Sequence, residues 1–432
     1  MSLLGEIEKT GASAAVGAVS TLGERGVLRF ITAGSVDDGK SPLIGRLLHD
    51  THAIMEDQFS AVERASVRRG ALEPDLSLLT DGLEAEREQG ITIDVAYRYF
   101  ATPRRKFIIA DTPGHEQYTR NMVTGASTAD AAIILLDAAK GMLAQSKRHL
   151  LIAHLLGIRN VIVAVNKMDS VDNDQRVFDS VKAAFSGFAA PLAIKGLHFV
   201  PVCALRGDMV VDRGDHLGWY EGATVLEHLE AIEPEFAAIT LPLRLPVQLV
   251  NRGDPARGYA GRIAAGKAMI GDELVALPSG RRTRVRTIVA PDGERALAVA
   301  GESVTLTLTD ELDIARGDML VGVAGAPRAV TTITATLCWL SEDPLRTDVR
   351  YVLRHTTRKV KAKILQVNNC LDIHTLEKRV PNGALRMNDI ADVTLGLQQP
   401  VFADAYDVVR TTGAFILIDP ATNRTVAAGM IK

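Results

Sequence analysis

The chain has 432 residues, of which 47% are hydrophobic and 23% charged, a composition typical of a globular protein with roughly two to four domains. Its net charge is −3, from 49 basic and 52 acidic residues, which excludes the overall positive charge that favours nucleic acids. Three scattered cysteines exclude a disulfide framework, and no apolar run reaches the ~18 residues of a membrane span, so we expect a cytoplasmic protein.

Residues 1–26 are small and polar and lack the apolar core of a secretory signal, so we expect an N-terminal extension. The β-prone residues 27–33 predict a strand, and apolar residues recur at helical spacing within 43–48. Between them lies the pattern G-x-x-x-x-G-K-[ST], formed by Gly34, Ser35, Val36, Asp37, Asp38, Gly39, Lys40 and Ser41. In such a loop backbone N–H groups contact phosphate oxygens, the lysine reaches the terminal phosphates, and the serine hydroxyl holds Mg²⁺.

Pro42 interrupts the usual chemistry of this loop. A proline is tolerated in the first turn of a helix, but it has no N–H to offer to a phosphate, and it disfavours helical geometry at Ser41. We therefore predict that Pro42 weakens the hold on a nucleotide.

From residue 27 to residue 236, apolar runs alternate with helical stretches, which predicts an α/β domain with a parallel sheet. The run 107–110 is followed by Asp111, Thr112, Pro113, Gly114 and His115. Asp111 can hold Mg²⁺ through water, and the N–H of Gly114 can contact a γ-phosphate. Thr92 lies between the two motifs, and its hydroxyl can complete the Mg²⁺ shell when a γ-phosphate is present.

Two later segments predict that the base is guanine. One consists of Asn166, Lys167, Met168 and Asp169, and the other of Cys203, Ala204 and Leu205. The Asp169 carboxylate can accept hydrogen bonds from the N1–H and 2-amino groups of guanine, which adenine lacks, while a backbone N–H of the second segment can meet the guanine carbonyl. Each motif alone also fits a turn, a helix cap or an ordinary buried side chain, but their combination and order favour a guanine-nucleotide site.

After Pro234 the pattern changes to short strands with frequent glycine and proline turns, which predicts two β-barrels over 240–325 and 329–432. Pro242 and Pro246 indicate a linker before the first barrel. The basic segment 354–363 fits RNA contact, but its alternation fits better the solvated face of a strand.

These motifs resemble the translation-factor class of GTPases, over nearly the whole chain after residue 26. The resemblance implies an α/β P-loop GTPase domain followed by two β-barrel domains, and attack of water on the γ-phosphate. His115 matches the residue that orients the attacking water, although it also fits a surface histidine after a turn. Val36 and Ile91 match the hydrophobic gate of that class, and both also fit simple core residues.

Longer stretches are similar to the GTPase subunit of bacterial ATP sulfurylase. These are Asp37-Asp38, 43–50, 80–100, 412–419 and 427–431. The resemblance implies a hetero-oligomer with a smaller catalytic subunit that makes adenosine 5′-phosphosulfate from ATP and sulfate, driven by GTP hydrolysis in this chain. Some relatives carry a C-terminal adenylylsulfate kinase, which we do not expect here because no second phosphate loop follows. Cys203 and Pro42 stand where a serine and a threonine are usual.

Two other functions fit the same motifs. A translation factor would bind aminoacyl-tRNA, whereas the preferred interpretation involves no nucleic acid and no membrane. A GTPase that has lost turnover would serve only as a structural partner.

Overall fold

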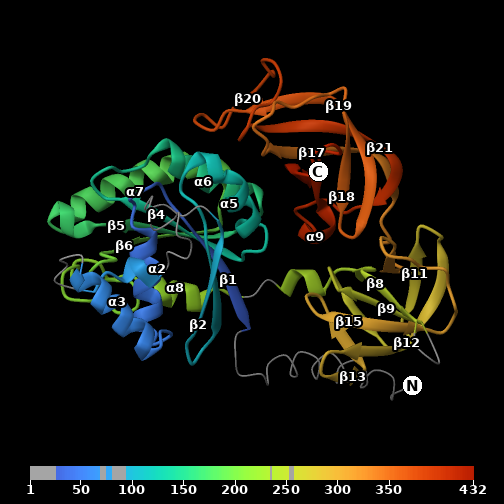
Figure 1. The fold of residues 1–432 in the computed structure, drawn as a ribbon, viewed down its shortest axis with the longest axis horizontal. Helices are drawn as coiled ribbons and strands as arrows, with labels where there is room; N and C mark the ends of the chain where they lie inside the picture. Colours follow the sequence, from blue (N-terminus) through green and yellow to red (C-terminus); the bar gives the residue numbers. More distant parts are fainter. Residues whose placement is uncertain (1–25, 69–73, 80–93, 234–235, 253–256) are drawn as a thin grey trace, which may run out of the picture. The chain divides into compact units, whose positions relative to one another are not determined.

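The chain divides into two compact units, Met1–Pro234 and Glu235–Lys432. The computed structural model describes residues 26–68, 74–79, 94–233, 236–252 and 257–432 (Figure 1). The predicted N-terminal extension therefore lies outside the described residues, apart from Gly26.

The first unit is built on a mostly parallel sheet. Its strands are β1 (Val27–Ala33), β2 (Ala96–Ala101), β3 (Lys106–Asp111), β4 (Ala131–Asp137), β5 (Asn160–Asn166) and β6 (Gly196–Pro201). They are arranged in the order β2-β3-β1-β4-β5-β6, and β2 alone among them runs antiparallel to its neighbour. β4 is buried along its whole length, as a continuous apolar strand covered on both faces should be.

Helices cover both faces of this sheet. The α-helices are α2 (Lys40–Asp50), α3 (Glu56–Arg68), α5 (Thr119–Ala126), α6 (Ala144–Leu155), α7 (Gln175–Ala189) and α8 (Val225–Ala231). Short 3₁₀ turns are η1 (Leu76–Leu79), η2 (Glu116–Tyr118), η3 (Met168–Val171) and η4 (Ala190–Leu192). In Figure 1, α5, α6 and α7 lie on one face and α2, α3 and α8 on the other. The predicted α/β class is confirmed.

The parallel register brings the carboxyl ends of several strands to one edge. Thr32 of β1 pairs with Asp111 of β3, and Asp137 of β4 pairs with Asn166 of β5. Because ligands of open α/β sheets bind beyond the carboxyl ends of the strands, the loops after β1, β3, β4 and β5 form one candidate site.

The second unit begins with η5 (Phe236–Ile239) and a sheet of short strands. The strands are β7 (Arg244–Pro246), β8 (Leu249–Arg252), β9 (Arg257–Arg262), β10 (Lys267–Met269), β11 (Glu273–Leu277), β12 (Arg281–Ala290), β13 (Gly293–Arg295), β14 (Leu297–Val299), β15 (Ser303–Leu308) and β16 (Met319–Gly322). Their main order is β7-β16-β11-β12-β15-β9-β8, while β10 and β14 pair separately. The linker prediction is wrong for Pro246, which ends β7 opposite Met319, because a strand end tolerates a residue without an N–H.

The remaining strands form a closed barrel. They are β17 (Ala329–Trp339), β18 (Arg350–His355), β19 (Arg358–Leu371), β20 (Lys378–Arg379), β21 (Ile390–Phe402), β22 (Ala414–Ile418) and β23 (Thr425–Ile431), with the short helix α9 (Arg410–Gly413) before β22. The order is β18-β22-β23-β17-β21-β19-β20, and a further pairing of β18 with β19 closes the ring. Closure leaves no long unpaired edge around a core that includes Trp339, Leu353 and Val393.

The two barrel sheets contact each other within this unit. Phe402 of β21 joins Leu277, Met319 and Val321 in one buried cluster. The Arg244 guanidinium donates to both carboxylate oxygens of Asp404 at 3.0 and 2.9 Å, a bidentate geometry that favours strong ion pairing. The β-barrel class is confirmed, whereas the domain limits predicted at 236, 240–325 and 329–432 stay predictions.

Candidate nucleotide-binding site

The loops after β1 and β3 each contain a glycine at a position where a Cβ would clash. Gly39 has a φ of 94°, in the left-handed region, and a Cβ there would lie 2.2 Å from Nδ2 of Asn166. A Cβ on Gly114 would lie 2.5 Å from the carbonyl oxygen of Gly34. The loop after β3 therefore packs directly against the loop after β1, as the motif order predicts.

Lys40 is the buried cation of this loop. The residue is only 8% exposed, and its Nζ donates to the carbonyl oxygens of Gly34 at 3.0 Å and Ser35 at 3.1 Å. Burial lowers the pKa of Lys40, while the carboxylates of Asp111 and Asp38 oppose this change. Because a buried ammonium held mainly by neutral carbonyls gains from an anion, the loop suits a phosphate group.

Ser35 and Asp38 leave polar atoms unsatisfied beside Lys40. Oδ2 of Asp38 accepts from the backbone N–H of Ser35 at 2.6 Å. Its Oδ1 and the Ser35 Oγ are buried without a hydrogen-bond partner among the described residues. Burial is also the main reason that the pKa of Asp38 is raised. Since such atoms cost about 1–3 kcal/mol each, their presence marks a place where a ligand or water completes the bonding.

Ser41 and Asp111 are the two predicted Mg²⁺ ligands that lie within the described residues. Asp111 is 2% exposed, and one of its oxygens accepts from the Thr32 hydroxyl at 3.2 Å. The Thr112 hydroxyl donates to the Thr32 carbonyl at 2.7 Å, which ties the end of β3 to β1. A hydroxyl and a carboxylate fit Mg²⁺, which keeps several waters and shares phosphate oxygens. The third predicted ligand, Thr92, lies outside the described residues, as does Ile91.

His115 is half-buried at the start of the turn that follows Gly114. Its Nδ1 accepts from the backbone N–H of Gln117 at 3.3 Å, and its ring lies 6.1 Å from that of Tyr118. An Nδ1 that accepts leaves the proton of a neutral imidazole on Nε2, so Nε2 is the donor available to a water molecule. Val36, the residue of the predicted gate that lies within the described part of the chain, is also half-buried.

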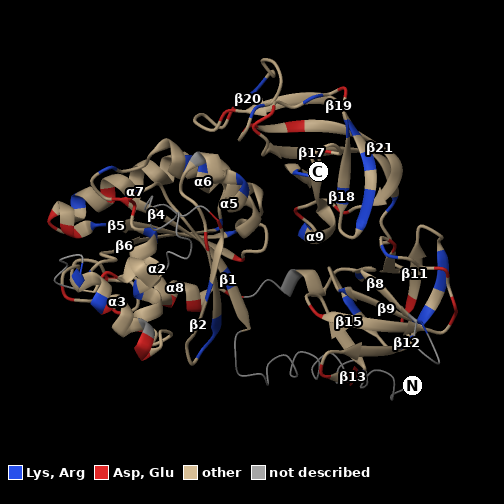
Figure 2. Cartoon of the chain, in the orientation of Figure 1, with Lys and Arg blue, Asp and Glu red and all other residues tan. Residues whose placement is uncertain are grey.

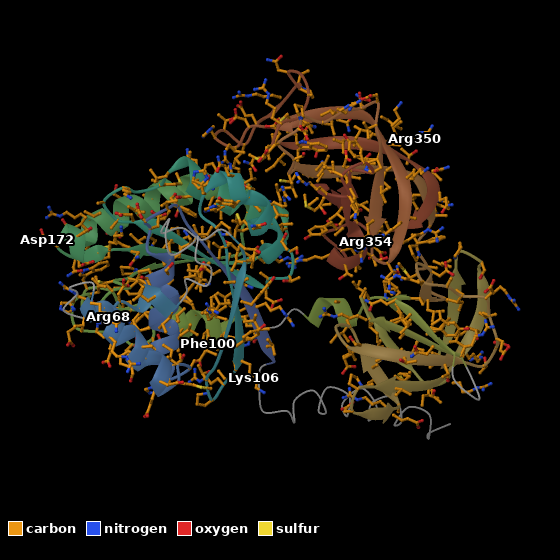
Figure 3. All side chains as sticks on the ribbon, viewed as in Figure 1. Arg68, Phe100, Lys106, Asp172, Arg350 and Arg354 are labelled. Atoms are coloured by element: carbon orange, nitrogen blue, oxygen red, sulfur yellow. The ribbon has the colours of Figure 1, made fainter. Side chains whose placement is uncertain are left out.

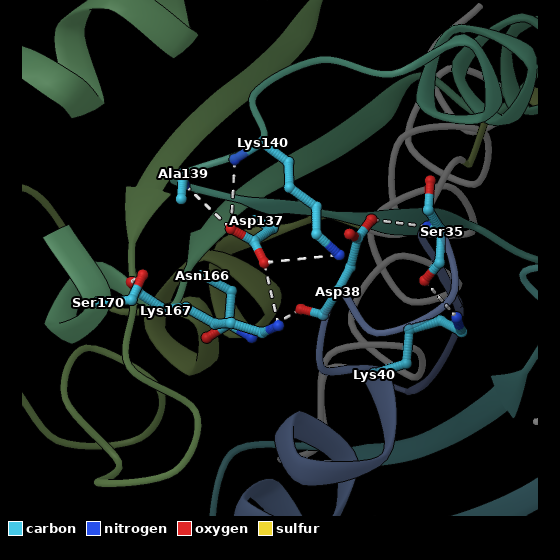
Figure 4. A network of polar contacts seen from close by, with 9 residues as sticks. All are labelled: Ser35, Asp38, Lys40, Asp137, Ala139, Lys140, Asn166, Lys167 and Ser170. Carbon is cyan, nitrogen blue, oxygen red and sulfur yellow. Dashed lines mark hydrogen bonds and ion pairs between the residues drawn. The ribbon is translucent and has the colours of Figure 1, made fainter. Parts of the chain in front are cut away.

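Asn166, which Figure 4 shows beside Asp38, connects the phosphate loop to the loop that contains Ala204. Its Nδ2 donates to the Asp38 carbonyl at 2.8 Å, and its Oδ1 accepts from the Ala204 N–H at 3.0 Å. One side chain therefore satisfies two backbone groups from separate loops. This contact was not foreseen from the sequence, where Asn166 was only part of a motif.

Asp169 and Cys203 lie together at the other end of this connection. The Cys203 thiol is 3.2 Å from Oδ1 of Asp169, and the Met168 N–H donates to the Val202 carbonyl at 3.3 Å. Burial is the main cause that raises the pKa of Cys203 to about 11, so the thiol stays protonated and can donate. The side chain of Leu205 is exposed, unlike those of Cys203 and Ala204. The Leu205 carbonyl oxygen accepts a hydrogen bond from Arg46.

Asp137 is a residue of this site that the motifs missed. It ends β4, and its carboxylate accepts from Nζ of Lys167 at 3.0 Å and from the Ala139 N–H at 2.9 Å. Burial alone would raise the pKa of Asp137, but these bonds outweigh it and lower the pKa. Lys167, whose φ is 60°, is thereby held in a left-handed conformation. The available signal was an aspartate directly after the apolar run 132–136.

This fold and site define a P-loop GTPase of the translation-factor class. Residues 25–239 match the family described as the elongation factor Tu GTP binding domain, and residues 332–432 match the GTP-eEF1A C-terminal domain-like family.

Closer relatives specify the family. The chain is 50% identical to sulfate adenylyltransferase subunit 1 of Shewanella oneidensis and of Laribacter hongkongensis, covering 94% of this chain and 85% of each relative. It is also 50% identical to the bifunctional enzyme CysN/CysC of Mycobacterium tuberculosis, over 94% of this chain and 67% of that protein. The chain belongs to the sulfate adenylyltransferase subunit 1 family. None of the helices in its described part is long and apolar enough to cross a bilayer.

Proposed function

We propose that this chain binds GTP with Mg²⁺, hydrolyses the GTP, and couples the released free energy to formation of adenosine 5′-phosphosulfate from ATP and sulfate. A separate, smaller subunit would carry out the adenylyl transfer. The names of the relatives support the reaction, and their designation as a subunit supports a partner. The three free cysteines support a reducing compartment, and we place the reaction in cytoplasmic sulfate assimilation.

The observation that carries the GTP part is the double contact of Asn166. Its amide joins the phosphate loop at Asp38 to the loop at Ala204, with bonds of 2.8 and 3.0 Å. These two bonds support our proposal that the phosphate and base subsites lie on either side of Asn166. Asp169, at the end of the same segment, is proposed to accept the N1–H and 2-amino protons of guanine.

We assign separate roles in GTP hydrolysis to the residues near the phosphate loop. Lys40 is proposed to exchange its two carbonyl contacts for the terminal phosphates, where its charge is neutralised. Ser41 and Asp111 would hold Mg²⁺, with Thr92 as the third protein ligand, and the bound ion would neutralise phosphate charge. His115 is proposed to hold the attacking water through Nε2, because its Nδ1 is already bonded to the Gln117 backbone.

A change of base specificity tests this proposal. The chain is co-purified with its small subunit, and pyrophosphate release from ATP and sulfate is measured with GTP or with xanthosine triphosphate. Asp169→Asn replaces an acceptor by a donor, so the GTP stimulation should fall by at least about a hundredfold while xanthosine triphosphate gains activity. The matched control is Asp172→Asn, because Asp172 is exposed three positions away and its φ of 53° suits asparagine (Figure 3).

Three outcomes would refute the assignment. If pyrophosphate release by the wild-type complex does not depend on GTP, the proposed coupling is wrong. If Asp169→Asn and Asp172→Asn have equal effects, the proposed contact between Asp169 and guanine is wrong. Salt-sensitive binding of aminoacyl-tRNA, without any coupled pyrophosphate release, would favour the translation-factor alternative.

A further inference from the structure

A cavity of about 540 Å³ in the second unit is lined mainly by basic residues. Its lining includes Arg316, Arg354, Arg358, Lys359, Gly317 and Thr357, and none of its described lining residues is acidic. The GTP site accounts for none of these residues. In Figure 2, blue segments mark the lysine and arginine positions along the neighbouring strands β18 and β19.

The β18–β19 hairpin places like charges opposite one another. Arg354 pairs with Lys359, and Arg350 pairs with Lys363, and all four residues are exposed. Directly opposed like charges destabilise an antiparallel pair, so their presence calls for a compensating anion.

The two pairs differ in their surroundings. Lys363 has the Asp348 carboxylate near enough for an electrostatic interaction, although Arg346 also contacts this carboxylate at 2.8 Å. Arg354 and Lys359 instead line the cavity. Figure 3 shows Arg350 and Arg354 at separate positions along β18.

The cavity is also partly preorganised. The Arg316 guanidinium donates to the Gln248 carbonyl at 2.6 Å, and Nη1 of Arg358 lies 3.6 Å from the Asp318 carboxylate. These contacts hold two of the four cations in place. Nε of Arg358 and the Thr357 hydroxyl oxygen are buried without a hydrogen-bond partner among the described residues. Such unused polar atoms beside a basic cavity are expected where a ligand supplies the missing partner.

We propose that this cavity binds an oxyanion with two or more linked phosphate groups, such as pyrophosphate or the phosphate chain of a nucleotide. Four cations and the neighbouring Asp318 leave a net charge of 4 − 1 = +3. One phosphate group carries only about −1.5 to −2, so two linked groups match this charge better. The volume also falls in the range of small-molecule sites, roughly 300–1,000 Å³. Arginine guanidinium groups suit phosphate oxygens because they donate in a planar fork.

Calorimetric titration of inorganic pyrophosphate into the full chain tests the proposal. The chain is first loaded with one equivalent of GDP, which keeps the phosphate loop occupied, and the ionic strength is low. One binding event is expected, and Arg354→Gln or Lys359→Gln should each weaken it by about tenfold or more. Arg350→Gln and Lys363→Gln are the matched controls, because they lie on the same face outside the cavity lining and should leave the affinity unchanged.

The outcomes separate the possible ligands. ATP binding that depends on the same two residues would identify a nucleotide, and pyrophosphate binding without ATP binding would identify the inorganic ion; either supports the proposal. Absence of both would overturn it, as would sulfate binding as tight as pyrophosphate binding. Equal losses in all four variants, or an RNA oligonucleotide that binds with equal dependence on both pairs, would assign the effect to the whole basic face. The measurement involves no turnover, so its failure is distinguishable from failure of the proposed GTP coupling.

Discussion

Replacing Pro42 by threonine should tighten the binding of guanine nucleotides. Pro42 is the third residue of α2, and the helix forms despite it, with the Leu43 N–H donating to the Gly39 carbonyl at 3.1 Å. Ser41 lies in α2, so the expected bias of Pro42 against helical geometry at Ser41 does not exclude it from the first turn. The first turn also requires no N–H from position 42. The predicted weakening of nucleotide binding therefore rests on the backbone N–H that Pro42 lacks.

The geometry indicates where a new N–H at position 42 would be used. The first backbone hydrogen bond of α2 runs from the Leu43 N–H to the Gly39 carbonyl, so an N–H at position 42 would have no acceptor within the helix. The nearby Asp38 carbonyl already accepts from Nδ2 of Asn166 at 2.8 Å. A threonine N–H is therefore largely available to a phosphate. One hydrogen bond to a charged group contributes about 1.5–3 kcal/mol, so we expect a dissociation constant lower by a factor of about 30, which corresponds to about 2 kcal/mol.

Titration with a fluorescent GDP analogue measures this change. Pro42→Ala is the control, because it restores the N–H without the hydroxyl and should give most of the gain. Thermal unfolding of the nucleotide-free variants checks that the substitution itself costs less than about 1 kcal/mol. Equal affinities of wild type and Pro42→Thr for the GDP analogue would refute the reasoning. A gain in affinity that is seen in Pro42→Thr but not in Pro42→Ala would show that the threonine hydroxyl, and not the N–H, is responsible.

Three further substitutions probe the same unit. Asn166→Ala removes the hydrogen-bond partner of the Asp38 carbonyl and of the Ala204 N–H. The free energy of unfolding of the nucleotide-free protein, measured by urea titration, should therefore fall by about 2–4 kcal/mol. An unchanged urea midpoint would contradict the role of Asn166 as a bridge between the two loops. His115→Ala should slow single-turnover GTP hydrolysis by about 10²-fold or more with GDP affinity unchanged, whereas a matching loss of affinity would indicate a binding role. Burial, with smaller effects of Lys40 and Arg148, lowers the pKa of His149 from 6.5 to about 3. The unfolded chain therefore takes up a proton that the folded chain excludes, and the stability that is present above pH 6.5 falls with pH, by about 1.4 kcal/mol at about pH 5.5. Urea unfolding at about pH 7.5 and pH 5.5 should show this loss reduced in His149→Gln, and an equal loss in the variant would contradict it.

Much of the fold was predictable because its signals are local. The buried runs around Ile133 and Ile162 are continuous, as strands covered on both faces must be, and both form central strands. The glycine loop at 34–41 follows β1 and leads into α2 because its conformations depend on the residues within it. The closure of the second barrel was not predictable in detail, since the pairing of β18 with β19 depends on a register between strands.

The sequence by itself determined the nucleotide class and the family, because each motif consists of residues that are close together in the chain. Only the tertiary structure decided how these motifs act on one another. Asn166 contacts Asp38 across 128 positions, and Asp137 holds Lys167 because β4 and β5 are in register. The basic cavity likewise combines Arg316, from the segment between β15 and β16, with Arg354 of β18. Such contacts depend on packing between elements, and no pattern along the chain encodes the register of that packing.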